Sequence, residues 1–167
     1  MVRKILKNIF IGERNTCISN EWDKIIHADK NCWNKVKKKE FKSLEQEKKK
    51  NFEDFVFIHP DYIAYEDGNH LYLNMIDGHE KYFSTPLFIK SLNFLEKYSE
   101  EKILIHCDKG KSRSSSILML YFAKRIKIIG STSYFVAKED YINNYDKEYL
   151  PSPGIEIYLK KNWSLIN

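Results

Sequence analysis

The sequence contains few cysteines and lacks the pairings that cysteines usually signal. Only Cys17, Cys32 and Cys107 occur among 167 residues, which is not the even set of a disulfide-stapled secreted domain. The N-terminal segment is short and interrupted by lysine, unlike a signal peptide. We therefore expect a reducing, cytoplasmic setting for this chain.

Long apolar runs, internal repeats and domain linkers are also missing. No stretch approaches the roughly 20 apolar residues of a transmembrane helix, so we expect no integral membrane segment. The composition, with 43% hydrophobic and 14% aromatic residues, is sufficient for a buried core. A chain of 167 residues suits one domain, and we expect residues 1–167 to form it.

Metal-ligand spacings are absent as well. The five histidines are scattered along the chain, and no His-x3-His or Cys-x2-Cys pair occurs. The sequence therefore predicts no metal site and no cofactor.

The most informative segment is 106–114, His-Cys-Asp-Lys-Gly-Lys-Ser-Arg-Ser, in which five residues separate Cys107 from Arg113. An apolar, strand-like run at 103–105 precedes the segment, and a helix-like run from Ser115 to Lys127 follows it. A tight loop between a strand and a helix N-terminus presents backbone N–H groups to an anion. The pattern predicts a phosphate-binding loop with a nucleophile at its centre.

Each residue type in this loop has a chemical reason. The thiolate of Cys107 would be the nucleophile, and a helix N-terminus beside an arginine favours that ionised form. Arg113 would place a planar fork on two phosphate oxygens, and Gly110 would allow the tight turn. Ser114 would donate a hydrogen bond to the Cys107 sulfur and ease its departure, whereas His106 would hold the loop from behind.

The segment resembles the signature of the cysteine-dependent protein tyrosine phosphatase superfamily: His-Cys, five residues, Arg, then Ser or Thr. Ser116, Leu120-Tyr121-Phe122 and Lys124-Arg125, which follow it, are similar to the small dual-specificity phosphatase branch. This resemblance implies an α/β domain with a central mixed or parallel sheet flanked by helices. The residues implied to bind substrate are His106, Asp108, Lys109, Gly110, Lys111 and Ser112. The structural alternative is a buried cysteine beside a capping serine.

The resemblance also implies a general acid upstream of the nucleophile, because the leaving oxygen needs a proton. Asp77 is the candidate, since it follows the strand-like run 71–76 at about the spacing that small members of the family use. Asp61 and Asp67 are weaker rivals, and Asp67 belongs to a hairpin turn expected between 62–66 and 70–73. Glu80 is a possible helper or substitute.

The expected activity is hydrolysis of phosphate monoesters through a cysteinyl-phosphate intermediate. A phosphorylated protein, carrying phosphotyrosine, phosphoserine or phosphothreonine, is the expected substrate. Lys109 and Lys111 favour the alternative of a small anionic phosphate: an inositol polyphosphate, a phosphoinositide or an RNA 5′-phosphate. A catalytically silent phosphate-binding module is a second class of function, and a cysteine-based redox enzyme is a third.

The rest of the chain predicts the flanking elements. Strands are expected at 8–12 and 22–26, and helices at 33–52, 86–98, 132–145 and 153–163. The helix at 33–52 is rich in lysine, which indicates a solvated face or an anionic partner. Because the net charge of +5 is modest, we do not expect nucleic acid as that partner.

Overall fold

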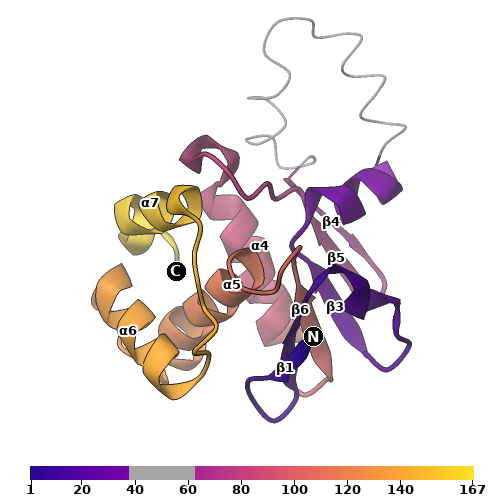
Figure 1. Ribbon diagram of the computed structural model, residues 1–167, viewed down its shortest axis with the longest axis horizontal. Helices are drawn as coiled ribbons and strands as arrows, with labels where there is room; N and C mark the ends of the chain where they lie inside the picture. Colours follow the sequence, from indigo (N-terminus) through magenta and orange to yellow (C-terminus); the bar gives the residue numbers. More distant parts are fainter. Residues whose placement is uncertain (38–62) are drawn as a thin grey trace, which may run out of the picture.

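A six-stranded mixed sheet forms the centre of the structure (Figure 1). The computed structural model describes residues 1–37 and 63–167. The strand order is β1-β2-β6-β3-β5-β4, in which β2, β6, β3 and β5 run parallel and the edge strands β1 and β4 run antiparallel to their neighbours. The strands are β1 (Val2–Lys4), β2 (Ile9–Gly12), β3 (Lys24–His27), β4 (Ala64–Asp67), β5 (His70–Leu73) and β6 (Ile103–His106).

The central strand β6 is apolar along most of its length because both of its faces are covered. All four of its residues are buried, which matches the uninterrupted Ile-Leu-Ile run in the sequence. His106, its last residue, is in register with Gly12 of β2 and His27 of β3. The chain therefore leaves β6 at the carboxyl edge of three parallel strands, where ligands bind in open α/β sheets.

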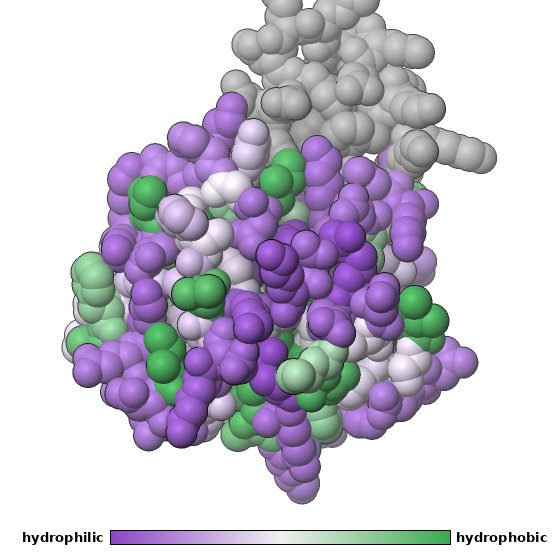
Figure 2. All heavy atoms as spheres, viewed as in Figure 1, coloured by the Kyte–Doolittle hydropathy of each residue, from purple (hydrophilic) through white to green (hydrophobic). Residues whose placement is uncertain are grey.

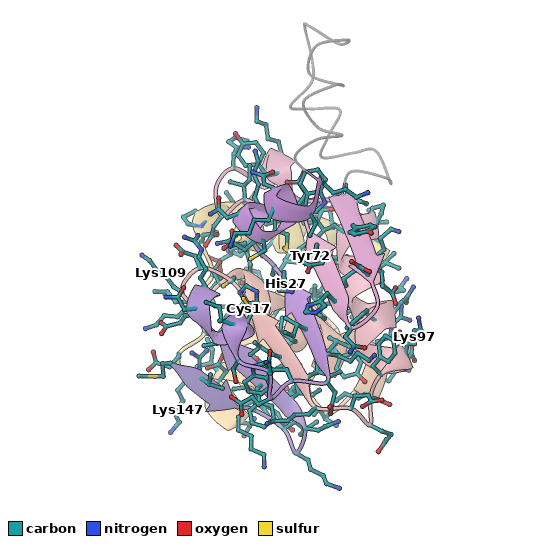
Figure 3. The ribbon with its side chains drawn as sticks, turned by 90° about the vertical axis from the view of Figure 1, so that its right-hand side faces the viewer. Cys17, His27, Tyr72, Lys97, Lys109 and Lys147 are labelled. Carbon is teal, nitrogen blue, oxygen red and sulfur yellow. The ribbon has the colours of Figure 1, made fainter. Side chains whose placement is uncertain are left out.

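Helices cover both faces of the sheet. Figure 1 shows α4, α5, α6 and α7 gathered on one side, and Figure 3 shows the opposite face, which carries η1 and the helical segment 30–37. The α-helices are α4 (Thr85–Lys97), α5 (Arg113–Tyr121), α6 (Tyr134–Asn144) and α7 (Pro153–Asn162). Shorter helical turns are η1 (Arg14–Ile18), η2 (Glu80–Tyr82), the π-helical η3 (Phe122–Ile126) and η4 (Trp163–Leu165).

Helix α5, which follows the loop 107–112, lies in the middle of the core. All nine residues of α5 are buried, and its apolar side chains pack with those of β2, β6 and α4. A helix that is buried all round needs partners for its polar side chains. The hydroxyl of Ser116 meets that of Tyr149 at 2.9 Å, so this turn of α5 is fixed in rotation about its axis.

Most of the predicted elements are confirmed, with differences that have local causes. The hairpin at 64–73 and the helices α4, α6 and α7 lie where the sequence indicated. The loop runs directly into α5, which begins at Arg113 rather than Ser115. β1 was not predicted, because a short, largely exposed edge strand carries no apolar alternation. Of the helix predicted at 33–52, residues up to 37 are helical, and the remainder lies outside the described residues.

The molecular surface in the view of Figure 1 is mostly hydrophilic, with apolar side chains appearing as separate spots (Figure 2). Such scattered apolar side chains are normal for a protein surface. Within residues 1–37 and 63–167, no helix has the length and apolar character needed to span a bilayer.

The N-terminal turn of α7 is seated directly against the loop that carries Asp77. A β-carbon built on Gly154 would lie 1.6 Å from the carbonyl oxygen of Gly78, so only glycine permits this approach. The main chain of α7 thus sets the position of the 77–78 loop.

We predict that Gly154→Ala destabilises the protein by about 1–3 kcal/mol, because the added methyl forces α7 and the 77–78 loop apart. Urea unfolding would measure the loss. Ile157→Ala, at an exposed position of the same helix, is the matched control and should change stability by less than about 0.5 kcal/mol. Equal stability of the two variants would contradict the predicted contact.

Candidate active site

Cys107 lies at the base of the loop, immediately after β6. Its side chain is buried, and its Sγ atom is 3.3 Å from the hydroxyl oxygen of Ser114 in the first turn of α5. Its backbone N–H donates to the carbonyl of Gly12 on β2. The sulfur is therefore fixed at the N-terminal end of α5, where the helix dipole favours a negative charge.

In the loop, the carbonyl groups and the N–H groups of the main chain have different surroundings. The carbonyls of Asp108, Gly110 and Lys111 accept from the Arg14 N–H, the Arg3 guanidinium and the Leu150 N–H. Among the described residues, the backbone N–H groups of 108–112 have no hydrogen-bond acceptor. A run of free N–H groups beside a helix N-terminus is an anion-binding concavity.

Gly110 has the backbone conformation that this turn requires. Its φ is +67°, in the left-handed region, and a β-carbon there would lie 2.8 Å from the carbonyl oxygen of Gly12. Both the dihedral angle and the close approach to Gly12 exclude a side chain, and the tight turn is the one that the sequence predicted.

A partly buried ion pair holds the loop from the side of β1. Arg3 donates to both carboxylate oxygens of Asp146 at 3.1 and 3.0 Å, and its Nη2 also donates to the Gly110 carbonyl at 2.6 Å. The Ser115 hydroxyl donates to Asp146 Oδ2 at 2.9 Å. Because the carboxylate is buried, this network is rigid only while every member has its partner.

Arg113 is buried with its guanidinium between two carboxylates. Its Nη1 donates to the carbonyl of Met75 at 2.9 Å and lies 3.7 Å from Asp29 Oδ1. Its Nε lies 3.8 Å from Asp77 Oδ2 and is a buried donor with no hydrogen-bond acceptor among the described residues. An unsatisfied buried donor beside an anion-binding loop is a group arranged for a ligand.

The structure brings Asp77 to this loop, as the sequence hypothesis required. Its Oδ1 accepts from the Ser112 hydroxyl at 3.2 Å, and Ser112 in turn accepts from the backbone N–H of Ser152 at 3.0 Å. The Asp77 side chain remains 31% exposed. A carboxyl group at the mouth of the loop is accessible to a leaving oxygen and to water.

Solved phosphatase structures resemble the whole chain, although no family model and no curated protein matches its sequence. The Cydia pomonella PTP-2 phosphatase has a TM-score of 0.61 and 17% identity, over 96% of this chain and 89% of its own. Human DUSP28 has a TM-score of 0.61 and 11% identity, over 98% and 93%. PTPMT1, in complex with PI(5)P, has a TM-score of 0.59 and 17% identity, over 99% and 96%.

This chain has the dual-specificity phosphatase fold. The resemblance noted in the sequence is thereby confirmed at the level of the fold. Within this phosphatase fold, the loop 107–113 occupies the carboxyl edge of the sheet, between β6 and α5.

The rivals of Asp77 lie elsewhere in the fold or are engaged by other residues. Asp67 is exposed at the end of β4, the far edge strand, and pairs in register with His70. Glu80 forms an ion pair with Lys161 of α7 at 2.8 Å. Asp61 lies outside the described residues.

The charged side chains at the loop rim differ in their surroundings. Asp108 pairs with Arg14 at 3.0 Å, and Lys111 pairs with Glu148 at 2.7 Å. The hydrogen bond from Lys111 lowers the pKa of the Glu148 carboxyl. Lys109 is exposed (Figure 3) and has no carboxylate within ion-pair distance in the described part of the chain. Within the described residues, Lys111 is therefore in an ion pair and Lys109 is not.

Asp29 is a functional candidate that the sequence analysis missed. It is buried after β3, 2.8 Å from Arg14 Nε, and it also faces Arg113. Burial raises the pKa of its carboxyl, but the N–H of Asn31 and the two guanidinium groups outweigh this and hold the pKa below its ordinary value. The same hydrogen bond raises the pKa of Arg14. The sequence signal that could have identified Asp29 is an acidic residue two positions after the end of β3.

His106, the residue before Cys107, belongs to a chain of imidazoles. Its Nε2 is 2.7 Å from His27 Nδ1, and His27 Nε2 is 3.0 Å from His70 Nδ1. Burial lowers the pKa of His27, which favours the neutral ring. Cys17 and Cys32 approach the same rings, and the hydrogen bond from Cys32 lowers the pKa of Cys17.

We predict that Arg3→Gln destabilises the fold by about 3 kcal/mol or more, because it leaves the buried carboxylate of Asp146 without its cation. It should also weaken binding of inorganic phosphate, since the Gly110 carbonyl loses its donor. Denaturant unfolding and calorimetric titration would measure the two effects. Lys4→Gln, an exposed change on the same strand, should alter neither. Unchanged phosphate affinity in Arg3→Gln would show that the loop holds its shape without the hydrogen bond from Arg3 to the Gly110 carbonyl.

Proposed function

We propose that this protein is a phosphatase that hydrolyses phosphate monoesters through a cysteinyl-phosphate intermediate. The observation that carries the proposal is the position of Cys107 Sγ, 3.3 Å from the Ser114 hydroxyl, at the base of a loop in which the N–H groups of 108–112 have no acceptor among the described residues. A nucleophile, an anion cradle and a carboxyl group at its mouth are the parts that phosphoryl transfer needs.

In the first step, the Cys107 thiolate attacks phosphorus in line with the ester oxygen. A sulfur–phosphorus bond forms as the phosphorus–oxygen ester bond breaks, and Asp77 gives a proton to the departing oxygen. The loop N–H groups and Arg113 bind the three equatorial oxygens, where the negative charge is carried. The unsatisfied Nε–H of Arg113 suits one of these oxygens.

In the second step, water attacks the phosphorus of the intermediate. Asp77, now ionised, accepts a proton from that water as the sulfur–phosphorus bond breaks and inorganic phosphate forms. The Ser114 hydroxyl donates to the departing thiolate sulfur. Ser112 orients the Asp77 carboxyl in both steps through its hydrogen bond to Oδ1.

A phosphorylated protein is the substrate that we propose, with phosphotyrosine, phosphoserine or phosphothreonine as the reacting group. The pairing of Lys111 with Glu148 supports this choice, because it reduces the positive potential that a polyphosphate would need. The exposed Lys109 and the similarity to PTPMT1, which was crystallised with PI(5)P, favour a second candidate, an inositol or lipid phosphate.

We predict that Cys107→Ser abolishes phosphate release and that Asp77→Asn lowers kcat about 10²–10⁴-fold. The Asp77→Asn defect should be smallest on aryl phosphates with acidic leaving groups, which need little protonation. Asp67→Asn, an exposed aspartate outside the loop, is the matched control and should retain full activity. Turnover by Cys107→Ser would exclude the covalent mechanism.

We also predict that phosphopeptide is preferred over a polyphosphorylated inositol when kcat/KM values are compared. On that substrate, Lys109→Gln and Lys111→Gln should each change kcat/KM by less than about threefold. Strong preference for the inositol, with a large loss only in Lys109→Gln, would instead support the second candidate. Phosphate binding without turnover of either substrate would indicate a silent binding module.

A further inference from the structure

Four metal-ligating side chains meet behind the phosphate-binding loop. Cys17 comes from η1, His27 ends β3, Cys32 lies in the helical segment 30–37, and His106 ends β6. One ligand atom from each lies within 4.8 Å of the corresponding atoms of the other three. Figure 3 shows Cys17 and His27 side by side at the face of the sheet.

The donor set has the chemistry of a zinc site. Two thiol sulfurs and two imidazole nitrogens form the Cys2His2 set of closed, tetrahedral structural sites, and soft sulfur ligands disfavour magnesium and calcium. His27, Cys32 and His106 are buried, and Cys17 is partly buried. Four protein ligands would leave no open position for a substrate or a catalytic water.

The distances between the donor atoms suit such a tetrahedron. With ordinary zinc–ligand lengths, nitrogen atoms in the shell are about 3.3 Å apart, sulfur and nitrogen about 3.5 Å, and two sulfurs about 3.8 Å. His27 Nδ1 and His106 Nε2 are 2.7 Å apart, and Cys32 Sγ is 4.0 Å from His106 Nε2. Adjustments of roughly half an ångström, within reach of side-chain rotation, would produce the coordination geometry.

The surroundings of His27 support its role as a ligand. Its Nε2 lies 3.0 Å from His70 Nδ1, so its Nδ1 faces the cluster while the other ring nitrogen has a hydrogen-bond partner. The ring also stacks on Tyr72, with centroids 4.4 Å apart and planes at 8°. Such outer contacts fix the tautomer and orientation of a metal-bound histidine.

We infer that Cys17, His27, Cys32 and His106 bind one Zn²⁺ as a structural site. The ion would join η1, β3 and the segment 30–37 to the residue that immediately precedes Cys107. It would thereby anchor the base of the loop, without taking part in phosphoryl transfer. This inference does not depend on the proposed phosphatase activity.

The full-length protein, purified without chelators under reducing conditions, should contain about one zinc per chain by elemental analysis. Cys17→Ser and Cys32→Ser should each lose most of this zinc. Cys107→Ser is the matched control, because it removes the third cysteine, which lies outside the cluster, and it should retain the metal. Zinc lost from Cys107→Ser but kept by the other two variants would place the ion on the nucleophile and overturn the inference.

Two measurements on the unsubstituted protein do not rely on variants that fold well. Chelator-treated protein should regain stability with added Zn²⁺, with Tm rising roughly 5–10 °C at free zinc near 100 times Kd. Co²⁺ should give the visible bands of a tetrahedral ion and a thiolate charge-transfer band. Absence of both effects would refute the site, as would recovery of Cys17 and Cys32 as a disulfide-linked peptide pair from protein prepared under reducing conditions.

Discussion

Hydrogen bonds to the carbonyl groups of the 107–113 loop are the interactions on which the site depends. Donors from β1, from η1 and from the segment before α7 take these carbonyls, so the peptide planes turn their N–H groups the other way. An anion cradle of this kind needs no side chain of its own. It needs a scaffold that prevents the loop from satisfying its own N–H groups internally.

Charge balance around Arg113 shows how the same scaffold tolerates a buried guanidinium. Asp29 and Asp77 lie at ion-pair distance on two sides, yet among the described residues only the carbonyl of Met75 makes a close hydrogen bond to the guanidinium. The positive charge of Arg113 is thus balanced by two carboxylates, but its hydrogen-bond donors are incompletely satisfied. This arrangement lowers the stability of the fold when no anion is bound. Rigid partners such as Asp29, which is held by Arg14 and Asn31, allow the fold to carry that cost.

Sequence reasoning found the parts of the site that are encoded locally. The loop 106–114 lies between an apolar strand and a helix, and Asp77 follows a strand, so position along the chain was sufficient to place them. Asp29, Arg3 and Asp146 act through partners distant in sequence, and no periodicity records such pairings. The cluster of Cys17, His27, Cys32 and His106 was missed for the same reason. Its four side chains come from four elements and lack the close sequence spacing of a metal motif.

The ion pair between Arg3 and Asp146 also joins two parts of the chain that are synthesised far apart in time. Asp146 follows Arg3 by 143 residues, and Leu150, whose N–H donates to the Lys111 carbonyl, comes later still. Contacts between residues so far apart in sequence carry a large loop-closure entropy cost, which slows folding. A nascent chain that ends before Asp146 therefore contains Cys107 and Arg113, but it lacks the carboxylate that orients Arg3 and the Leu150 N–H that binds the Lys111 carbonyl.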